Sequence, residues 1–476
     1  MKVLLIAPPD NKVLEPFASS PIKPTPLLWG FPLGLGYLAA YLKKNGHKPL
    51  ILDCLHYDYN LSTIKKKIQK INPDLVGIMI MTPWARSAVA VAKIVKEINK
   101  QLPVIGGGPH AAFDYENLLK NYNFDYIVIG EGEITLLELV DYLAKKKGKK
   151  KRKIFGIAYR QKGKVYVNPL RPLITNLDEM PFPARELVKF EDYITNSLLP
   201  QAVEIVGSRG CSHRCAFCSS SHFWKKWRAR SPENIIEEIK VLIKKYPQIK
   251  SFLFYDDNFT LDKERIIHLC KLLIAEGLNR YYWSCLGRAD QVDEEMLALM
   301  KKAGCQKISY GVESGSPKIL KNVDKFLDLS KVREAIRVTR KVGIEALAFF
   351  MIGNPGETEA TVKQSIRFAK RLKPTSTAWS ITQVLPGTKI AAMQPVANFI
   401  GYQYDPELDK PYPFLSPFLP TFDNEGMGRE KLKKIHRRVF RYFTFHHLLD
   451  DPLSRVKHFF YSPSNGLSFL YSLFRR

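Results

Sequence analysis

The chain is poor in the features that mark exported, membrane-spanning or disulfide-stapled proteins. Its 476 residues include only seven cysteines, an odd number, and Cys54 is the only one among the first 200 residues. So few thiols do not make a disulfide framework, and they predict a reducing compartment. No uncharged apolar run reaches the ~18 residues of a membrane span. The apolar part of Met1–Asp10 is too short for a signal peptide, so we expect a cytoplasmic protein.

Acidic residues are also scarce, with 46 Asp and Glu against 73 Lys and Arg and a net charge of +27. A basic balance can indicate nucleic-acid binding. Here, however, Lys145–Lys153 and Arg429–Arg476 each carry +8, so 16 of the 27 charges lie in two short segments. The first of these is predicted to be a solvated linker. The charge therefore predicts no specific nucleic-acid partner.

The length predicts two or three domains, and the 45% hydrophobic content is that of an ordinary globular protein. The fold class predicted from the pattern along the chain is α/β. Up to about residue 143, apolar runs alternate with amphipathic segments. This alternation predicts a doubly wound, Rossmann-like parallel sheet with helices on both faces. The predicted strands are Val3–Ala7, His47–Asp53, Asp74–Met81, Pro103–Gly107 and Asp125–Gly130, and the predicted helices are Leu33–Lys44, Leu61–Ile71, Ala85–Lys100 and Ala111–Asn121.

The carboxyl edge of that sheet is the expected ligand site, because open α/β sheets bind ligands beyond the ends of their strands. Glycines at this edge would let the backbone approach a bulky ligand. No G-x-G-x-x-G motif follows the first strand, which argues against a dinucleotide. The candidate contacts at this edge are Thr82, Gly106, Gly107, Gly108, His110, Glu131, Gly132 and Glu133.

A second alternation begins near Ala202, after a linker and hairpin over residues 144–198. Six strands are predicted to begin near Ala202, Ser251, Tyr281, Gln306, Ile344 and Ala378, with helices such as Pro232–Lys245 and Asp293–Ala303 between them. Six β/α units over residues 199–395 predict an open, partial (β/α)6 barrel, with its chemistry at the carboxyl ends of the strands. Residues 396–476 are predicted to form a mainly helical C-terminal cap.

The first barrel strand leads into a loop with three cysteines, Cys211, Cys215 and Cys218, at the spacing C-x3-C-x2-C. Thiolates are the natural ligands of iron–sulfur clusters, and three of them leave one iron of a [4Fe–4S] cube open. The alternatives are a disulfide or a structural zinc site, which needs four ligands. His213 or a distant cysteine would have to be the fourth, and His213 lies too tightly between its neighbours to chelate the same ion easily. We therefore favour the cluster.

This spacing, with Phe217 directly before the last cysteine, resembles the signature of the radical S-adenosylmethionine (SAM) superfamily. The resemblance implies that the three cysteines hold a [4Fe–4S] cluster whose open iron takes the amino and carboxylate groups of SAM. It also implies SAM contacts after successive strands. These are Phe217 near adenine, Asp256, Asp257 and Asn258 at the methionine end, Arg288 at the carboxylate, Glu313 and Ser314 at the ribose, and Gly353, Pro355, Gly356 and Glu357 at the barrel mouth.

The N-terminal region, with Pro32–Ala40 and the strand-end glycines, resembles the cobalamin-binding domain that precedes many radical SAM barrels. Domains of this kind that ligate cobalt through histidine carry D-x-H-x-x-G. In this chain Asp53 is followed by His56, one place late, and the glycine is absent. We therefore expect cobalamin to bind without an axial histidine from this motif, and we interpret His56 and His110 as ordinary polar residues.

The double resemblance implies an enzyme that uses the cluster, SAM and cobalamin to functionalise an unactivated carbon of a small-molecule or lipid-like substrate, with an external one-electron donor. Methyl transfer is the expected reaction. The alternative is radical cyclisation, rearrangement or oxidation without methyl transfer. Methylthiotransfer to RNA would need three N-terminal cysteines, of which only Cys54 is present. A zinc-stapled nucleic-acid module would instead bind polynucleotide in a strongly salt-dependent way.

The basic, aromatic-rich segment Arg429–Arg476 has two interpretations. Its amphipathic pattern is typical of a helix that lies on an anionic membrane surface. The same pattern also suits a helix that caps the barrel mouth. We therefore expect a cytoplasmic protein that caps its own barrel and touches the inner membrane face only peripherally.

Overall fold

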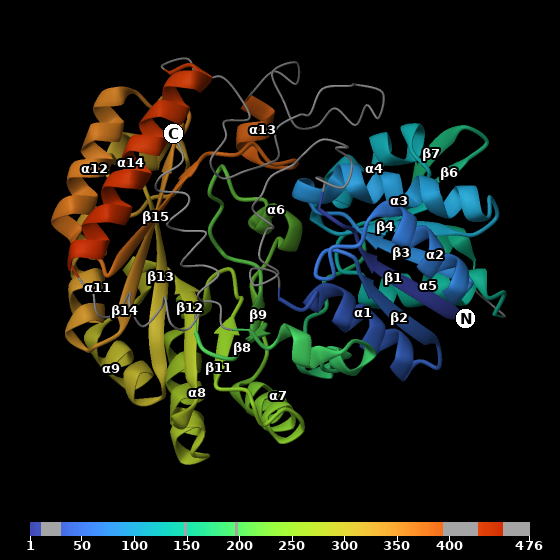
Figure 1. The fold of residues 1–476 in the computed structure, drawn as a ribbon, viewed down its shortest axis with the longest axis horizontal. Coiled ribbons are helices and arrows are strands. Elements are labelled where there is room, and N and C mark those ends of the chain that lie inside the picture. The colour runs from blue at the N-terminus through green and yellow to red at the C-terminus, as the bar shows by residue number, and fades with distance from the viewer. Residues whose placement is uncertain (11–29, 147–149, 196–198, 394–426, 451–476) are drawn as a thin grey trace. The chain divides into compact units, whose positions relative to one another are not determined.

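The computed structural model describes residues 1–10, 30–146, 150–195, 199–393 and 427–450 (Figure 1). These residues belong to two compact units, which divide along the chain between Tyr193 and Ile194. Each unit is built on its own sheet. None of the helices within the described ranges is long and apolar enough to cross a membrane.

The first unit has a seven-stranded sheet in the order β2-β1-β3-β4-β5-β6-β7. Five strands run parallel at the predicted places: β1 Lys2–Ala7, β2 Lys48–Asp53, β3 Leu75–Met79, β4 Val104–Gly107 and β5 Tyr126–Val128. The hairpin β6 Ile157–Gln161 and β7 Lys164–Val167 continues this sheet with antiparallel pairing. The hairpin that we placed in the linker is therefore a part of the first sheet.

Helices cover both faces of this sheet, as a doubly wound fold requires. One face carries α2 Leu61–Ile71, α3 Ala85–Ile98 and α4 Pro109–Asn121, and the other carries α1 Leu33–Lys44 and α5 Glu133–Leu143. Helix α5 was not predicted.

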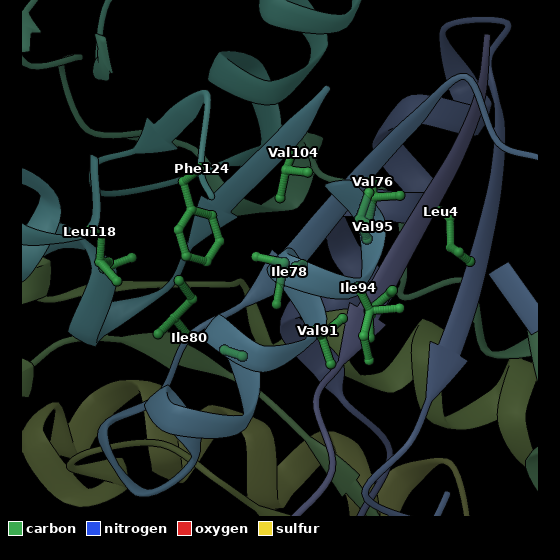
Figure 2. Close-up of a cluster of buried hydrophobic side chains, with 14 of the residues drawn as sticks. Leu4, Val76, Ile78, Ile80, Val91, Ile94, Val95, Val104, Leu118 and Phe124 are labelled. Atoms are coloured by element: carbon green, nitrogen blue, oxygen red, sulfur yellow. The ribbon is translucent and has the colours of Figure 1, made fainter. Parts of the chain in front are cut away.

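Successive side chains of a strand point to opposite faces, so Leu4 packs in one core and Leu5 in the other. Figure 2 shows the first of these cores, where Ile78 and Ile80 lie among Val91 and other helix side chains. The central strands β1, β3 and β4 are buried on both faces, which explains why they are almost entirely apolar.

The second unit has a six-stranded, all-parallel sheet in the order β15-β14-β13-β12-β11-β8. Its strands are β8 Ala202–Ile205, β11 Ser251–Phe254, β12 Tyr282–Gly287, β13 Cys305–Glu313, β14 Glu345–Ile352 and β15 Ser376–Ile381. The helices that follow them include α7 Pro232–Lys245, α8 Lys263–Ala275, α9 Glu294–Lys302, α10 Pro317–Asn322, α11 Leu329–Lys341 and α12 Glu359–Leu372. Strands β8 and β15 form the two edges, which confirms the predicted open (β/α)6 barrel.

Short elements complete the barrel unit around the cysteine loop. The two-residue strands β9 Ser208–Arg209 and β10 Arg228–Ala229 pair antiparallel. Helix α6, Ser220–Trp224, follows the cysteine loop, and α13, Lys389–Met393, follows β15.

Helix α14, Arg429–Asp450, lies along edge strand β15 beside α12 (Figure 1). The Phe443 ring stacks on Trp379 of β15 with a centroid separation of 5.2 Å, and His436 Nε2 lies 2.9 Å from the Trp379 carbonyl oxygen. This part of the C-terminal region therefore covers a sheet edge, where unpaired strand groups would otherwise be exposed. The aromatic residues predicted to contribute after Asp450 lie outside the described residues.

Candidate functional site

The three cysteines lie in the loop between β9 and α6, directly after the first barrel strand. Each carries a free thiol, with Cys215 buried and Cys211 and Cys218 half-buried. Burial raises the pKa of the Cys215 thiol to about 11 and also raises that of Cys218. Metal binding must therefore supply the free energy that deprotonates these thiols. Within the described residues no three His, Cys, Asp or Glu side chains converge closely enough to hold a single metal ion, which disfavours the zinc alternative. A [4Fe–4S] cube instead takes each thiolate on a separate iron, and three cysteines on one short loop supply three of its four ligands.

Backbone contacts from distant segments fix the shape of this loop. Gly210 has a φ of +84°, and a Cβ there would lie only 2.7 Å from the Lys226 carbonyl oxygen. The Ala216 N–H donates to the Val323 carbonyl over 2.9 Å, and the Ile390 N–H donates to the Ala216 carbonyl over 3.1 Å. These bonds hold the loop from both sides. The side chain of Phe217, the predicted adenine neighbour, packs against the small apolar cluster Ala216, Val323, Val384 and Ile390.

Two aspartates after β11 support the entrance to the cysteine loop. Asp256 accepts hydrogen bonds from the Gly207 N–H (2.7 Å) and the Ser208 hydroxyl (2.6 Å). Asp257 accepts one from the Gly210 N–H over 3.1 Å. Burial raises the pKa of Asp256 to about 6. We predicted that both would contact the methionine end of SAM; that role stays a prediction, and the structure gives each carboxylate a partner in the loop.

The next strand-end residues also have partners within the barrel. Asn258 Nδ2 donates to Gln291 Oε1 over 2.8 Å, and Gln291 Nε2 lies 3.3 Å from His213 Nε2. The Nε2 atom of His213 therefore already has the Gln291 side-chain amide as a neighbour, which disfavours His213 as a fourth zinc ligand. Arg288 donates to both carboxylate oxygens of Asp290, over 3.0 and 2.9 Å. This bidentate pair fixes the plane of the guanidinium.

Glu313 and Ser314, the predicted ribose contacts, lie at the end of β13. The backbone of Glu313 is left-handed, with a φ of +66°, where the pairing of β13 with β14 shifts register. Ser314 is buried, and its Oγ lies 3.1 Å from Ser365 Oγ. The Glu313 carboxylate pairs with Lys325 Nζ over 3.1 Å. We did not predict Lys325, although its position after β13, at the same edge as Glu313, was a signal that could have identified it.

The loop after β14 is held by its own glutamate. Glu357 Oε2 accepts the N–H groups of Gly353 (2.6 Å) and of the next residue (3.1 Å). Burial raises the pKa of Glu357 to about 7. Asn322 Nδ2 donates to the Pro355 carbonyl over 3.0 Å, and Gly356 takes a φ of +73° beside it. Glu357 therefore shapes the loop that we predicted at the barrel mouth.

The glycines of the first unit's carboxyl edge fall into two kinds. A Cβ would lie 2.6 Å from a side chain at Gly106, 2.9 Å from a carbonyl oxygen at Gly108 and 2.9 Å from a side chain at Gly132. Packing within the protein explains these three. Among the described residues, the nearest atom at Gly107 would be 3.8 Å away, and at Gly130, with a φ of +85°, none lies within 4 Å. These two leave the space that a bulky ligand such as cobalamin would need.

His110 is directed at protein partners through both ring nitrogens. Its Nδ1 lies 3.2 Å from Thr82 Oγ1 and its Nε2 lies 3.4 Å from Asp114 Oδ2. Burial lowers the pKa of His110 to about 3, so the ring is neutral. The His56 ring stacks on Tyr193 with centroids 4.0 Å apart. The buried Nδ1 of His56 has no hydrogen-bond partner among the described residues, and the absence of a histidine ligand to cobalt stays a prediction.

The two glutamates predicted at this edge are both buried. Glu131 Oε2 accepts the Ile174 N–H over 2.8 Å, which ties a later loop to the end of β5. Glu133 is the first residue of α5, where a carboxylate interacts favourably with the helix dipole. Both glutamates therefore stabilise the loops and the helix start at the carboxyl edge of this sheet.

Comparisons with known proteins match both halves of the chain. The model of the Radical SAM superfamily matches residues 205–369, and that of the B12 binding domain matches residues 26–140. A Pyrococcus horikoshii protein named an uncharacterized methyltransferase is 39% identical over 392 residues, which are 82% of either chain. The anaerobic magnesium-protoporphyrin IX monomethyl ester cyclase of Rubrivivax gelatinosus is 29% identical over 433 residues, 90% of this chain and 76% of the relative.

A solved structure has a similar fold. The radical SAM methyltransferase TsrM from Kitasatospora setae, with cobalamin and a [4Fe–4S] cluster bound, aligns with a TM-score of 0.65 over 82% of this chain and 73% of that chain. The identity is 21%, so this likeness concerns the fold.

Proposed function

Because the chain belongs to the family of B12-binding radical SAM proteins, we propose that it transfers a methyl group to an unactivated carbon of a small-molecule substrate. Enzymes of this family use a [4Fe–4S] cluster, SAM and cobalamin. The cluster and SAM supply a radical that removes hydrogen from such a carbon, cobalamin supplies the methyl group, and the protein supplies binding and orientation.

One observation favours methyl transfer over other radical chemistry. The relative named as a methyltransferase is 39% identical to this chain, whereas the relative named as a cyclase is 29% identical. Ring closure or oxidation without methyl transfer is the second candidate. It is supported by the 90% of this chain that aligns with the cyclase.

The barrel's own residues have distinct proposed tasks at the site. The cysteines hold three irons, and reduction of the cluster needs an external one-electron donor. Arg288, whose guanidinium plane is fixed by Asp290, binds the SAM carboxylate, and Glu313 and Ser314 bind the ribose. Asp256 and Asp257 hold the entrance of the cysteine loop, and Glu357 holds the loop after β14.

By-products of SAM distinguish the two candidate reactions. Methyl transfer takes the methyl group of one SAM, which leaves S-adenosylhomocysteine, and cleaves a second SAM to 5′-deoxyadenosine and methionine. We expect both by-products, in similar amounts, when the anaerobic, cobalamin-loaded protein turns over with fractions of cell extract. Cyclisation or oxidation yields 5′-deoxyadenosine without S-adenosylhomocysteine. A Cys215→Ala protein is the control for background SAM breakdown.

We propose that cobalamin binds at the carboxyl ends of β4 and β5, next to Gly107 and Gly130, with no axial histidine from the protein. The described residues leave space at both positions, whereas His110 Nδ1 already lies within hydrogen-bond distance of Thr82. The electron paramagnetic resonance spectrum of bound cob(II)alamin is therefore expected to lack nitrogen splitting from an imidazole. Splitting that is present in the wild type and disappears in His110→Ala or His56→Ala would show that the missing ligand is a protein histidine.

We also propose a cytoplasmic location with weak contact at the inner membrane face. Lys434, Arg437 and Arg438 are exposed on α14, while Leu432 and Val439 of the same helix are buried in the barrel unit. Each basic residue near an anionic surface contributes roughly 1 kcal/mol, within a Debye length. The full chain is therefore expected to sediment with anionic vesicles at low salt and to detach at high salt.

A triple replacement of these three cations by glutamine should remove most of the vesicle binding. A matched triple replacement of exposed lysines on α7 and α8, at Lys240, Lys244 and Lys271, should leave it nearly unchanged. Equal losses in both variants would mean that net charge alone, and no surface of α14, is responsible.

A further inference from the structure

The Glu313–Lys325 ion pair lies over β13 inside the barrel unit. Lys325 Nζ is 3.1 Å from Glu313 Oε1, and the two side chains are only 8% and 10% exposed. Gly311 makes room for this pair, because a Cβ at that position would collide with Glu313 Oε1 and lie 3.0 Å from Lys325 Nζ. The pair therefore has a space of its own at the end of the strand that carries the proposed ribose contacts.

The turn that carries Lys325 has an unusual backbone. Its two neighbours, Asp324 and Phe326, have φ angles of +51° and +41°, a region that residues with a side chain rarely adopt. Such a conformation persists only where the surroundings hold it. Here the Val323 carbonyl accepts the Ala216 N–H of the cysteine loop, and Lys389 pairs with Asp324 over 2.7 Å. The turn is thus tied to the loop that carries the cysteines.

Lys325 lies next to a second cation, Arg288, at the turn that contacts the cysteine loop. The Lys325 carbonyl accepts a hydrogen bond from Arg288 Nη2 over 3.4 Å, so the two residues are adjacent. The Val323 carbonyl, two residues before Lys325, accepts the N–H of Ala216, the residue that follows Cys215, so the turn lies directly beside the cysteine loop. A cluster held by three thiolates is anionic, and reduction adds another negative charge. A nearby cation stabilises the reduced form and raises the reduction potential.

From this geometry we propose that Lys325 is a positioning residue with two tasks: it fixes the Glu313 carboxylate for SAM, and its ammonium makes the cluster easier to reduce. The proposal rests on the proposed function, because it requires a cluster at the three cysteines. From the sequence we had assigned no role to Lys325. It also assigns Lys325 a task separate from that of Arg288, which is paired with Asp290.

Two substitutions should move the cluster potential in opposite directions. Lys325→Met removes a positive charge and should lower the midpoint potential, measured by a redox titration followed by electron paramagnetic resonance. Glu313→Gln removes a negative charge and should raise it. Both should weaken SAM binding about tenfold, since each disrupts a charge-assisted contact. If the ion pair only maintained the local structure, both substitutions would shift the potential in the same direction.

Three further proteins complete the test. Lys325→Arg keeps the charge and should restore the potential, and Lys318→Met, which removes an exposed lysine from α10, should change neither readout. If Lys325→Met does not retain iron, Lys325→Met/Glu313→Gln removes the stranded carboxylate, and its potential should lie below that of Glu313→Gln. A Lys325→Met protein with full iron and a potential no lower than that of the wild type would overturn the proposal. So would a double variant with full iron and a potential no lower than that of Glu313→Gln. A wild-type protein without a cluster would overturn the proposed function first.

Discussion

Cys215→Ala is expected to leave a folded protein that holds almost no iron. Three thiolates must anchor the cube because the fourth iron is left for SAM, and two cysteines give too few ligands to retain it. Cys215 is the most buried of the three, so no water or external thiol easily replaces it. After anaerobic reconstitution, iron should fall from about four atoms per chain to near zero, with acid-labile sulfide falling in parallel.

The matched control for this variant is Cys270→Ala. Cys270 is buried on α8, away from the cysteine loop, and burial raises the pKa of its thiol above the ordinary range. This variant should keep its full iron content, since it removes a small buried side chain and no ligand. Unchanged iron and sulfide in Cys215→Ala would contradict the assignment of the cluster.

Asp256→Ala is expected to have the second-largest effect on stability and iron content. It acts by weakening the support of the cysteine loop and removes no cluster ligand. The substitution leaves the Gly207 N–H and the Ser208 hydroxyl buried without their acceptor. Each such group costs about 1–3 kcal/mol, so the barrel unit should lose roughly 2–6 kcal/mol of stability. Reconstituted iron should fall several-fold. Thermal unfolding and iron analysis of the same preparation measure both effects.

Asp256→Asn separates support of the loop from contact with SAM. The asparagine oxygen can still accept the Gly207 N–H, and the Ser208 hydroxyl can rotate to accept from the amide nitrogen. Iron content and SAM affinity should therefore stay within about twofold of the wild type, because both hydrogen bonds can still form and lose only a small part of their free energy. Full iron with SAM affinity lowered tenfold or more would mean that the Asp256 charge contacts SAM, as the sequence alone had suggested.

The fold was predictable because the central strands of the first sheet are buried on both faces and helices alternate with them. Val3–Ala7 is apolar throughout, and α2, which follows β2, buries Ile64 and Ile68 at helical spacing. Local signals also marked helix starts: Ser231 caps α7 by accepting the Asn234 N–H, with Pro232 at the first helical position. Helix α5 escaped prediction because it is rich in apolar residues around its circumference and follows β5 after a short glycine-rich turn.

The site was predictable only where its chemistry is local in the sequence. The three cysteines are close along the chain, so their spacing was informative. The partners of Asp256 lie 48 and 49 residues away, and no spacing rule connects them. At Gly106 and Gly108 packing and backbone conformation already require a glycine, so a ligand contact at these positions stays a prediction.

The central claim, methyl transfer to carbon, is tested most directly by following the methyl group itself. The reconstituted, cobalamin-loaded protein would be incubated anaerobically with SAM carrying a deuterated methyl group, a reductant and fractions of cell extract. Products would then be compared by mass with those of the Cys215→Ala protein. We predict a new product that contains one intact labelled methyl group bound to carbon. A product that forms only with the wild-type protein, differs from its precursor by lost hydrogen or a closed ring, and contains no label would contradict the account.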